Sequence, residues 1–137
     1  MSNDDVTESD DALTLSTEVQ TAIAATGFDW EHVDGVLEKV EEELGEIREA
    51  IQEGDVVHAR KELGDLLLIA VNLARFLEAD PRRELLDATH RLKIRFACMK
   101  EALEKAGESV KTCAPDELEA CWQRIKPEAD KRLREGA

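Results

Sequence analysis

Two short acidic segments of nearly identical sequence carry the strongest chemical signal in the chain. The first tetrad, residues 43–46, reads ELGE, and the second tetrad, residues 62–65, reads ELGD. Within each tetrad the two acids are three residues apart, so on a helix they share one face. Gly54 lies between the tetrads and predicts a turn, and antiparallel packing of the flanking helices would bring all four carboxylates to one locus.

Crowded carboxylates of this kind predict a bound cation. Ionised carboxylates repel one another, and beside an apolar segment such as residues 66–71 (LLLIAV) their charge is costly unless something positive is bound. Mg²⁺ prefers oxygen ligands and keeps room for waters and substrate phosphates. We therefore expect a Mg²⁺ site, with Mn²⁺ as an alternative ion, whose ligands are Glu43, Glu46, Glu62 and Asp65.

A simpler interpretation of the tetrads competes with the metal site. The chain has 32 acidic residues among 137, so a single E-x-x-E pair arises often by chance and usually lies on a solvated helix face. The repetition of the tetrad beside an apolar helix favours the cation site. The glycine inside each tetrad would let the helices, or a substrate, come close to the backbone.

Basic and polar residues near the tetrads favour a polyphosphate ligand. Lys39 and Asn72 lie at helical spacing from the tetrads, and Arg91 and Arg95 form an i,i+4 pair in a later segment. Guanidinium groups bind phosphate bidentately, which suits a substrate held by a metal cluster. Each residue also has a structural interpretation: Lys39 could pair with a helix glutamate, the two arginines could form surface salt bridges, and Asn72 could be a satisfied polar residue at an interface.

Other chemically versatile residues give weaker signals. Trp30 and Trp122 fit core or interface positions, and Trp122 is also a candidate stacking surface. Asp55 and His58 have the carboxylate-x-x-His spacing of di-iron bundles, but the sequence has no second copy of that motif, so we expect a surface histidine. The sequence contains no P-loop, G-x-S-x-G or H-E-x-x-H motif.

The composition predicts one all-α domain that does not bind nucleic acid polymers or membranes. Apolar residues make up 42% of the chain but aromatic residues only 4%, which favours an aliphatic, helical core. The net charge of −14 disfavours nucleic acid polymers and anionic membranes as partners. We see no signal peptide, and residues 66–71 are too short to span a bilayer. Three cysteines without C-x-x-C spacing indicate free thiols and a cytoplasmic setting: Cys98, Cys113 and Cys121.

Apolar periodicity and capping residues predict where the helices lie. Residues 1–17 are acidic and polar and are expected to be disordered, so that the domain covers 18–137. From Leu66 onwards one helix is apolar on nearly every side, which predicts that a second copy of the chain covers it. The expected helices are a short one at about 18–26, then about 30–53 with Asp29 as N-cap, 55–77, 81–106 begun by Asp80-Pro81, and 115–134.

These motifs together resemble a known family. The runs GFDWEHVDGVLEKVEEELGEIREAI and KELGDLLLIAVNLARFL, followed by DP, are similar to the MazG family of nucleoside triphosphate pyrophosphohydrolases over about residues 27–134. The resemblance implies a four-helix bundle-like all-α fold in an intertwined homodimer or dimer of dimers. It also implies Mg²⁺-dependent hydrolysis of a nucleoside triphosphate to the monophosphate and pyrophosphate.

The resemblance implies roles for single residues as well. It makes the four tetrad acids metal ligands, Glu42 the residue that activates water, and Lys39 part of a nucleotide-contacting stretch. Trp122 corresponds to an aromatic residue near the nucleotide. Residues 89–96 read THRLKIRF where the family often has N-x-K-F-x-x-R-F, so the basic residues Arg91 and Arg95 are kept while the Asn and Phe are replaced.

The leading hypothesis is therefore a house-cleaning enzyme that hydrolyses NTPs or dNTPs. A narrower hydrolase of the related all-α type, directed at dUTP or dCTP, is an alternative. A helical dimer that binds cations without catalysis is a second alternative. The preferred base and sugar are left open by the sequence.

Overall fold

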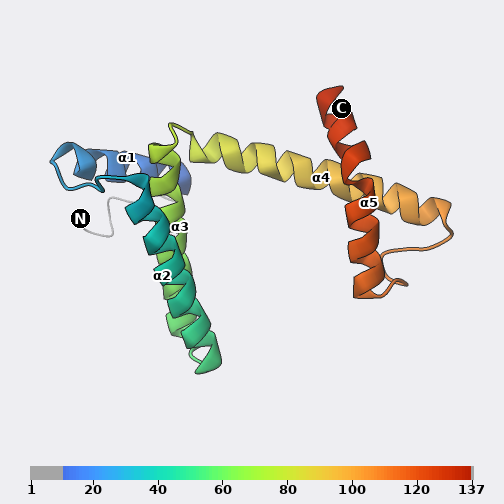
Figure 1. The fold of residues 1–137 in the computed structure, drawn as a ribbon, viewed down its shortest axis with the longest axis horizontal. Coiled ribbons are helices and arrows are strands. Elements are labelled where there is room, and N and C mark those ends of the chain that lie inside the picture. Colours follow the sequence, from blue (N-terminus) through green and yellow to red (C-terminus); the bar gives the residue numbers. More distant parts are fainter. Residues whose placement is uncertain (1–10, 137) are drawn as a thin grey trace. The chain divides into compact units, whose positions relative to one another are not determined.

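The computed structural model describes residues 11–136, which form five α-helices and no strand. The prediction of an all-α protein is confirmed. The chain divides into two compact units, the first ending at Arg83 and the second beginning at Glu84, and each is described by itself. Figure 1 labels the helices along the chain: α1 (Ala12–Ala25), α2 (Val33–Gln52), α3 (Val56–Phe76), α4 (Pro81–Lys105) and α5 (Pro115–Arg134).

An α2–α3 hairpin forms the centre of the first unit. The two helices pack side by side along their length (Figure 1). Gly54 makes the turn between them with a φ of 74°, a conformation that glycine adopts without strain. Asp55 then caps α3, because its Oδ1 accepts a hydrogen bond from the backbone N–H of His58 at 3.0 Å. The predicted turn and the predicted span of α3 are confirmed.

Helix α1 begins earlier than the sequence predicted. Asp11 is its N-cap and accepts hydrogen bonds from the backbone N–H groups of Leu13 and Thr14. The expectation that residues up to 17 are disordered is therefore wrong for 12–17, and residues 1–10 lie outside the described part of the chain. The helix packs against α3, where the side-chain amide of Gln20 donates a hydrogen bond to the backbone carbonyl of Leu68 at 3.0 Å. This tertiary contact supports a segment that its acidic composition alone did not favour.

The start of α2 also differs from the prediction. His32, rather than Asp29, precedes the first helical residue, and it makes no side-chain cap hydrogen bond. Asp29 instead pairs with Arg75 at the end of α3. Trp30 folds back onto Gly35, where a Cβ atom would lie only 3.0 Å from the indole ring. A glycine at position 35 therefore gives this tryptophan room to lie against the first turn of α2.

The second unit has a core of its own. The ribbons of α4 and α5 cross in Figure 1. Buried side chains from both helices belong to one hydrophobic cluster. Two ion pairs join the helices, Arg95 with Asp130 at 3.4 Å and Arg132 with Glu101 at 2.6 Å. The buried residues of this core are Cys98, Met99, Leu103, Cys121, Ile125 and Ala129. The three cysteines are free thiols, as predicted.

Helix α3 is only partly covered within the described chain. Val71 and Ala74 are buried, but Leu63, Leu67 and Leu68 remain 49%, 57% and 46% exposed. None of the helices between residues 11 and 136 has an apolar stretch long enough to cross a bilayer.

Candidate active site

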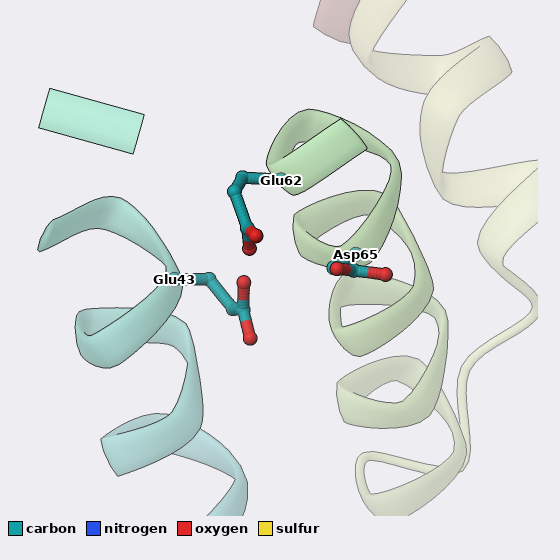
Figure 2. Close-up of side chains that lie close together, drawn as sticks. All are labelled: Glu43, Glu62 and Asp65. Carbon is teal, nitrogen blue, oxygen red and sulfur yellow. The ribbon is translucent and has the colours of Figure 1, made fainter. Parts of the chain in front are cut away.

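Three carboxylates from the two tetrads converge between α2 and α3. Glu43 projects from α2, and Glu62 and Asp65 project from successive turns of α3. One carboxylate oxygen from each lies within 4.8 Å of the others. Figure 2 shows Glu43 and Glu62 pointing toward one another across the space between the helices. Both of these residues are buried, and Asp65 is half-buried.

The register of the hairpin explains why the acids meet. Glu43 and Asp65 are equally far in sequence from Gly54, and so are Glu46 and Glu62. Two antiparallel helices of equal rise therefore place the members of each pair at the same height above the turn. Glu46 is half-buried, and its carboxyl group is a hydrogen-bonding neighbour of both Glu43 and Glu62.

The crowding shifts the pKa values of Glu43 and Glu62 in opposite directions. The pKa of Glu62 is raised to about 7 by hydrogen bonding with Glu43 and then with Glu46, and burial and like charge act in the same direction. The pKa of Glu43 is lowered, first by its hydrogen bond with Glu62 and also by Lys39. The permanent cation Lys39 lies beside Glu43 and favours the ionised form of that carboxyl group in the coupled pair.

Two basic side chains lie beside the acids at equivalent positions. Lys39 precedes Glu43 by four residues, and its Nζ lies 3.2 Å from Glu43 and 3.1 Å from Glu42. His58 precedes Glu62 by four residues, and its Nε2 lies 3.5 Å from the carboxylate. Lys39 does pair with a glutamate of its own helix, as its structural interpretation expected. One of its partners, Glu43, belongs to the acidic cluster itself.

The donor set fits a hard divalent cation. Oε2 of Glu43 is buried and lacks a hydrogen-bond partner among residues 11–136, which is costly for a carboxylate oxygen. Three further acids supply only oxygen donors around the same space, and none of the three cysteines is among them. Such a set suits Mg²⁺ or Mn²⁺ better than a thiolate-seeking metal.

A cavity of about 280 Å³ opens on the turn side of the cluster. Its walls include Glu62 from α3 and several acids from α2, and His58 lies at its edge. His58 is a surface histidine, as expected, because its side chain is 47% exposed. Its contact with Glu62 was missed, although its position four residues before the second tetrad repeats the spacing of Lys39 and the first.

The other predicted ligand-binding residues lie away from the three converging carboxylates or in the second unit. Asn72 is buried on α3 and lines a separate cavity. Arg91 is exposed on α4, and Arg95 pairs with Asp130, with its Nε buried and without a partner among the described residues. Trp122 is half-buried and packs against the core of the second unit.

The tetrad glycines do not serve helix packing within the chain. A Cβ atom added at Gly45 or Gly64 would meet no atom within 4 Å among the described residues. The expectation that these glycines let α2 and α3 approach each other is therefore wrong. Close approach of a substrate or of a second chain to this backbone stays a prediction.

Sequence reasoning also missed Arg75. Its guanidinium group binds Asp29 of the loop before α2 and donates to Oδ1 of Asn72 at 2.9 and 3.2 Å. A basic residue one turn after a buried asparagine was a usable signal, but its partner Asp29 is far away in the sequence and could not be identified locally.

The α2–α3 hairpin therefore places carboxylates from both helices close together, and this class of all-α protein has a candidate divalent-metal site. Residues 31–93 match the sequence model of the MazG nucleotide pyrophosphohydrolase domain, so this stretch contains a MazG domain and the resemblance seen in the motifs is confirmed.

Curated relatives agree with this assignment. The chain is 39% identical over 115 residues to the nucleoside triphosphate pyrophosphohydrolase/pyrophosphatase MazG of Thermotoga maritima, a match that covers 84% of this chain and 44% of the relative. It is 31% identical over 125 residues to the nucleoside triphosphate pyrophosphohydrolase of Escherichia coli K12, covering 90% of this chain and 48% of the relative. The chain thus spans about half the length of the curated relatives it matches.

Proposed function

We propose that this protein hydrolyses nucleoside or deoxynucleoside triphosphates to the monophosphate and pyrophosphate in a Mg²⁺-dependent reaction. The observation that carries the proposal is the convergence of Glu43, Glu62 and Asp65 within 4.8 Å. These three acids all lie inside the stretch that matches the MazG domain. The names of the two relatives support the same activity.

The residues around the cluster have distinct roles in this proposal. Mg²⁺ bound to the acids supplies positive charge that offsets the charge of the phosphate oxygens. Lys39, at the edge of the cluster, binds a substrate phosphate. Glu42, which is 55% exposed beside Lys39, accepts the proton of a water whose oxygen bonds to the α-phosphorus, while the bond to the bridging oxygen breaks and pyrophosphate leaves. The proposed metal ligands are Glu43, Glu46, Glu62 and Asp65.

Three residues of the second unit are proposed as substrate contacts through the family resemblance alone. Arg91 and Arg95 would bind phosphate oxygens, and Trp122 would contact the nucleotide. Within the second unit, Arg95 already pairs with Asp130, so phosphate would compete with that carboxylate for the guanidinium group.

We also propose that the active form is a homodimer or a dimer of dimers. The support is that α3 and α2 both expose leucines: Leu63, Leu67 and Leu68 on α3, and Leu37 and Leu44 on α2, which are 43% and 48% exposed. Burying such side chains in a second copy contributes about 25 cal/mol per Å² of apolar surface. Analytical ultracentrifugation tests this arrangement: Leu67→Glu should shift the protein to monomers, whereas Lys61→Glu, which changes another exposed residue of α3, should not. A cytoplasmic setting without nucleic acid polymers or membranes as partners stays a prediction.

The experiment that tests the activity measures pyrophosphate release from the canonical NTPs and dNTPs and from modified triphosphates, with Mg²⁺, Mn²⁺ or EDTA. Wild-type protein should release pyrophosphate only with a divalent cation. Glu43→Gln and Asp65→Asn should reduce kcat by at least about 100-fold, because each removes a charged oxygen ligand. Glu41→Gln is the matched control: it removes a carboxylate from the exposed face of α2 and should leave kcat unchanged.

The same panel separates the alternatives. A single dominant substrate such as dUTP or dCTP would indicate the narrower hydrolase. Full activity in Glu43→Gln and Asp65→Asn would refute the site. If Mg²⁺ raised the melting temperature while no triphosphate were hydrolysed, the protein would be a cation-binding helical dimer.

A further inference from the structure

A row of side chains that can bind metal extends along α3 beyond the second tetrad, toward the turn. His58, Glu62 and Asp65 follow one another at spacings of four and three residues, so they share one face of the helix. The backbone of His58 is fixed in the first turn of α3, because its N–H donates to Oδ1 of Asp55 at 3.0 Å. The imidazole therefore lies one helical turn from Glu62, on the side of the acidic cluster that is nearest the loop.

The contact between His58 and Glu62 is longer than a good hydrogen bond. Nε2 lies 3.5 Å from Oε1 of Glu62, whereas N–H···O hydrogen bonds measure about 2.7–3.2 Å. Two neighbouring ligands of one divalent ion are about 3.0–3.4 Å apart, because bonds of about 2.1 Å meet at the metal at right or tetrahedral angles. The separation of this nitrogen and this oxygen is thus close to that of two atoms that share a metal ion.

The cavity of about 280 Å³ on the turn side of the cluster provides space beside the imidazole. Ala50 and His58 are each four residues from Gly54, so they lie at the same height above the turn. A small side chain at position 50 leaves this space open on the α2 side. The wall of the cavity consists of Glu46, Glu49, Ala50, Glu53, His58 and Glu62.

The charge of this wall favours a cation over a phosphate. Four of the six wall residues are glutamates, and none of the six is a lysine or an arginine. A phosphate would be repelled by these carboxylates, whereas a divalent cation would be attracted. The cluster beside the wall also has an unsatisfied oxygen, since Oε2 of Glu43 is buried and lacks a hydrogen-bond partner among residues 11–136.

An imidazole changes which cations such a site prefers. Mg²⁺ is bound mainly by oxygen ligands, whereas imidazole suits iron, nickel and zinc, with cobalt between iron and nickel in affinity. We infer that His58 is a nitrogen ligand which, together with Glu62, holds a transition-metal ion at the turn side of the cluster and favours such ions over Mg²⁺. This inference rests on the metal site of the proposed function.

The simpler interpretation of His58 is a surface ion pair with Glu62 and no metal. Such a pair contributes little to stability, because the imidazole is 47% exposed. His58→Gln should therefore leave the melting temperature in EDTA unchanged. The variant can then be compared with the wild type in metal binding without a difference in folding.

Calorimetric titration of the untagged, metal-free protein measures the preference between metals. Co²⁺ and Mg²⁺ are titrated separately into the wild type and each variant. His58→Gln should weaken Co²⁺ binding about tenfold and Mg²⁺ binding less than about twofold, because it removes the nitrogen ligand and keeps every acid. His90→Gln is the matched control: it removes an exposed histidine of α4 and should change neither affinity.

A spectroscopic measurement assigns the nitrogen ligand directly. The chain has three histidines, His32, His58 and His90, so each can be tested by substitution. Pulsed EPR of the Co²⁺-loaded wild type should show coupling to an imidazole nitrogen. The coupling should disappear in His58→Gln and persist in His32→Gln and His90→Gln. An ion pair without metal would produce no such coupling.

The outcomes distinguish this inference from the proposed function. Absence of nitrogen coupling in the wild type, its persistence in His58→Gln, or equal Co²⁺ affinity in His58→Gln and wild type would each overturn the inference. If the coupling depends on His58 but no triphosphate is hydrolysed, the inference stands and the proposed activity fails. If pyrophosphate is released normally with Mg²⁺ while Co²⁺ shows no nitrogen coupling, the activity stands and His58 is not a ligand.

Discussion

The two acidic tetrads have almost the same sequence, but the pKa values of their first glutamates shift in opposite directions. Lys39 lies four residues before Glu43, and His58 lies four residues before Glu62. The lysine is a permanent cation at neutral pH, and its Nζ lies 3.2 Å from Glu43, whereas Nε2 of the histidine lies 3.5 Å from Glu62. The pKa of Glu43 is lowered, first by its hydrogen bond with Glu62 and also by Lys39, and the pKa of Glu62 is raised to about 7, first by hydrogen bonding with Glu43 and then with Glu46. A duplicated motif thus contains one carboxyl group whose pKa is lowered and one whose pKa is raised.

Among the variants that compare the two tetrads, the largest expected effect comes from removing the permanent cation Lys39. Lys39→Met should lower kcat/KM about 100-fold, because it removes a phosphate contact and the partner of both Glu42 and Glu43. His58→Gln should lower it less than tenfold, since the histidine touches only Glu62 and at 3.5 Å. Steady-state kinetics of pyrophosphate release measure both values. Equal losses in the two variants would contradict the asymmetry of the tetrads.

The pH dependence of stability should reveal the raised pKa of Glu62. In the metal-free folded protein this pKa is about 7, against an ordinary value of 4.5. Between these pH values the folded state binds more protons than the unfolded state, so the free energy of unfolding should fall as pH rises from about 4.5 to about 7. The lowered pKa of Glu43 affects stability in a different pH range. Its stabilising contribution is lost only as the pH falls below 4.5, the ordinary pKa of a glutamate.

Urea denaturation in EDTA at several pH values measures this effect. Glu62→Gln removes the titrating group, so the difference between wild type and variant isolates it from other titrations. The variant should lack the decrease between about pH 4.5 and 7. A wild-type curve parallel to that of the variant would show that the proton is not on Glu62.

The smallest expected effect concerns the glycine of each tetrad. A Cβ at Gly45 or Gly64 would meet no atom of the described chain within 4 Å, so alanine fits both helices. Gly45→Ala and Gly64→Ala should each raise the free energy of unfolding by about 0.5–1 kcal/mol, since glycine loses more backbone entropy on folding. Thermal denaturation gives the stability, and pyrophosphate release is measured in parallel. Loss of activity in a more stable variant would show that substrate or a second chain needs the bare backbone at that tetrad.

Much of the helical framework was predictable because its signals are local. Gly54 and Asp55 mark the turn and the cap between α2 and α3, and Asp80, Pro81 and Pro115 mark the later helix starts. The convergence of the tetrads followed from helical spacing and a short turn. Both arguments need only residues that lie close together in the sequence, and for that reason the structure agrees with them.

The unpredicted features depend on contacts between distant parts of the chain. Asp29 has the residue type of an N-cap, but it pairs with Arg75 and leaves His32 at the start of α2. Asp11 begins a helix in an acidic segment, and its other oxygen binds Nε of Arg82 at 3.0 Å. Neither partner is a sequence neighbour, so local propensity pointed to the wrong boundary in both cases. The cavity beside Asn72 depends on the same kind of contact.

The turn at Gly54 has a consequence for how the cluster can be inherited. All four tetrad acids lie on one uninterrupted stretch, residues 43–65, together with the loop that aligns them. Inserting or deleting one residue inside either helix, between its tetrad and the turn, would rotate that tetrad by about 100° about the helix axis and separate the four acids. Exchange of the stretch as a whole, by recombination or by grafting onto another antiparallel helix pair, would transfer the quartet intact.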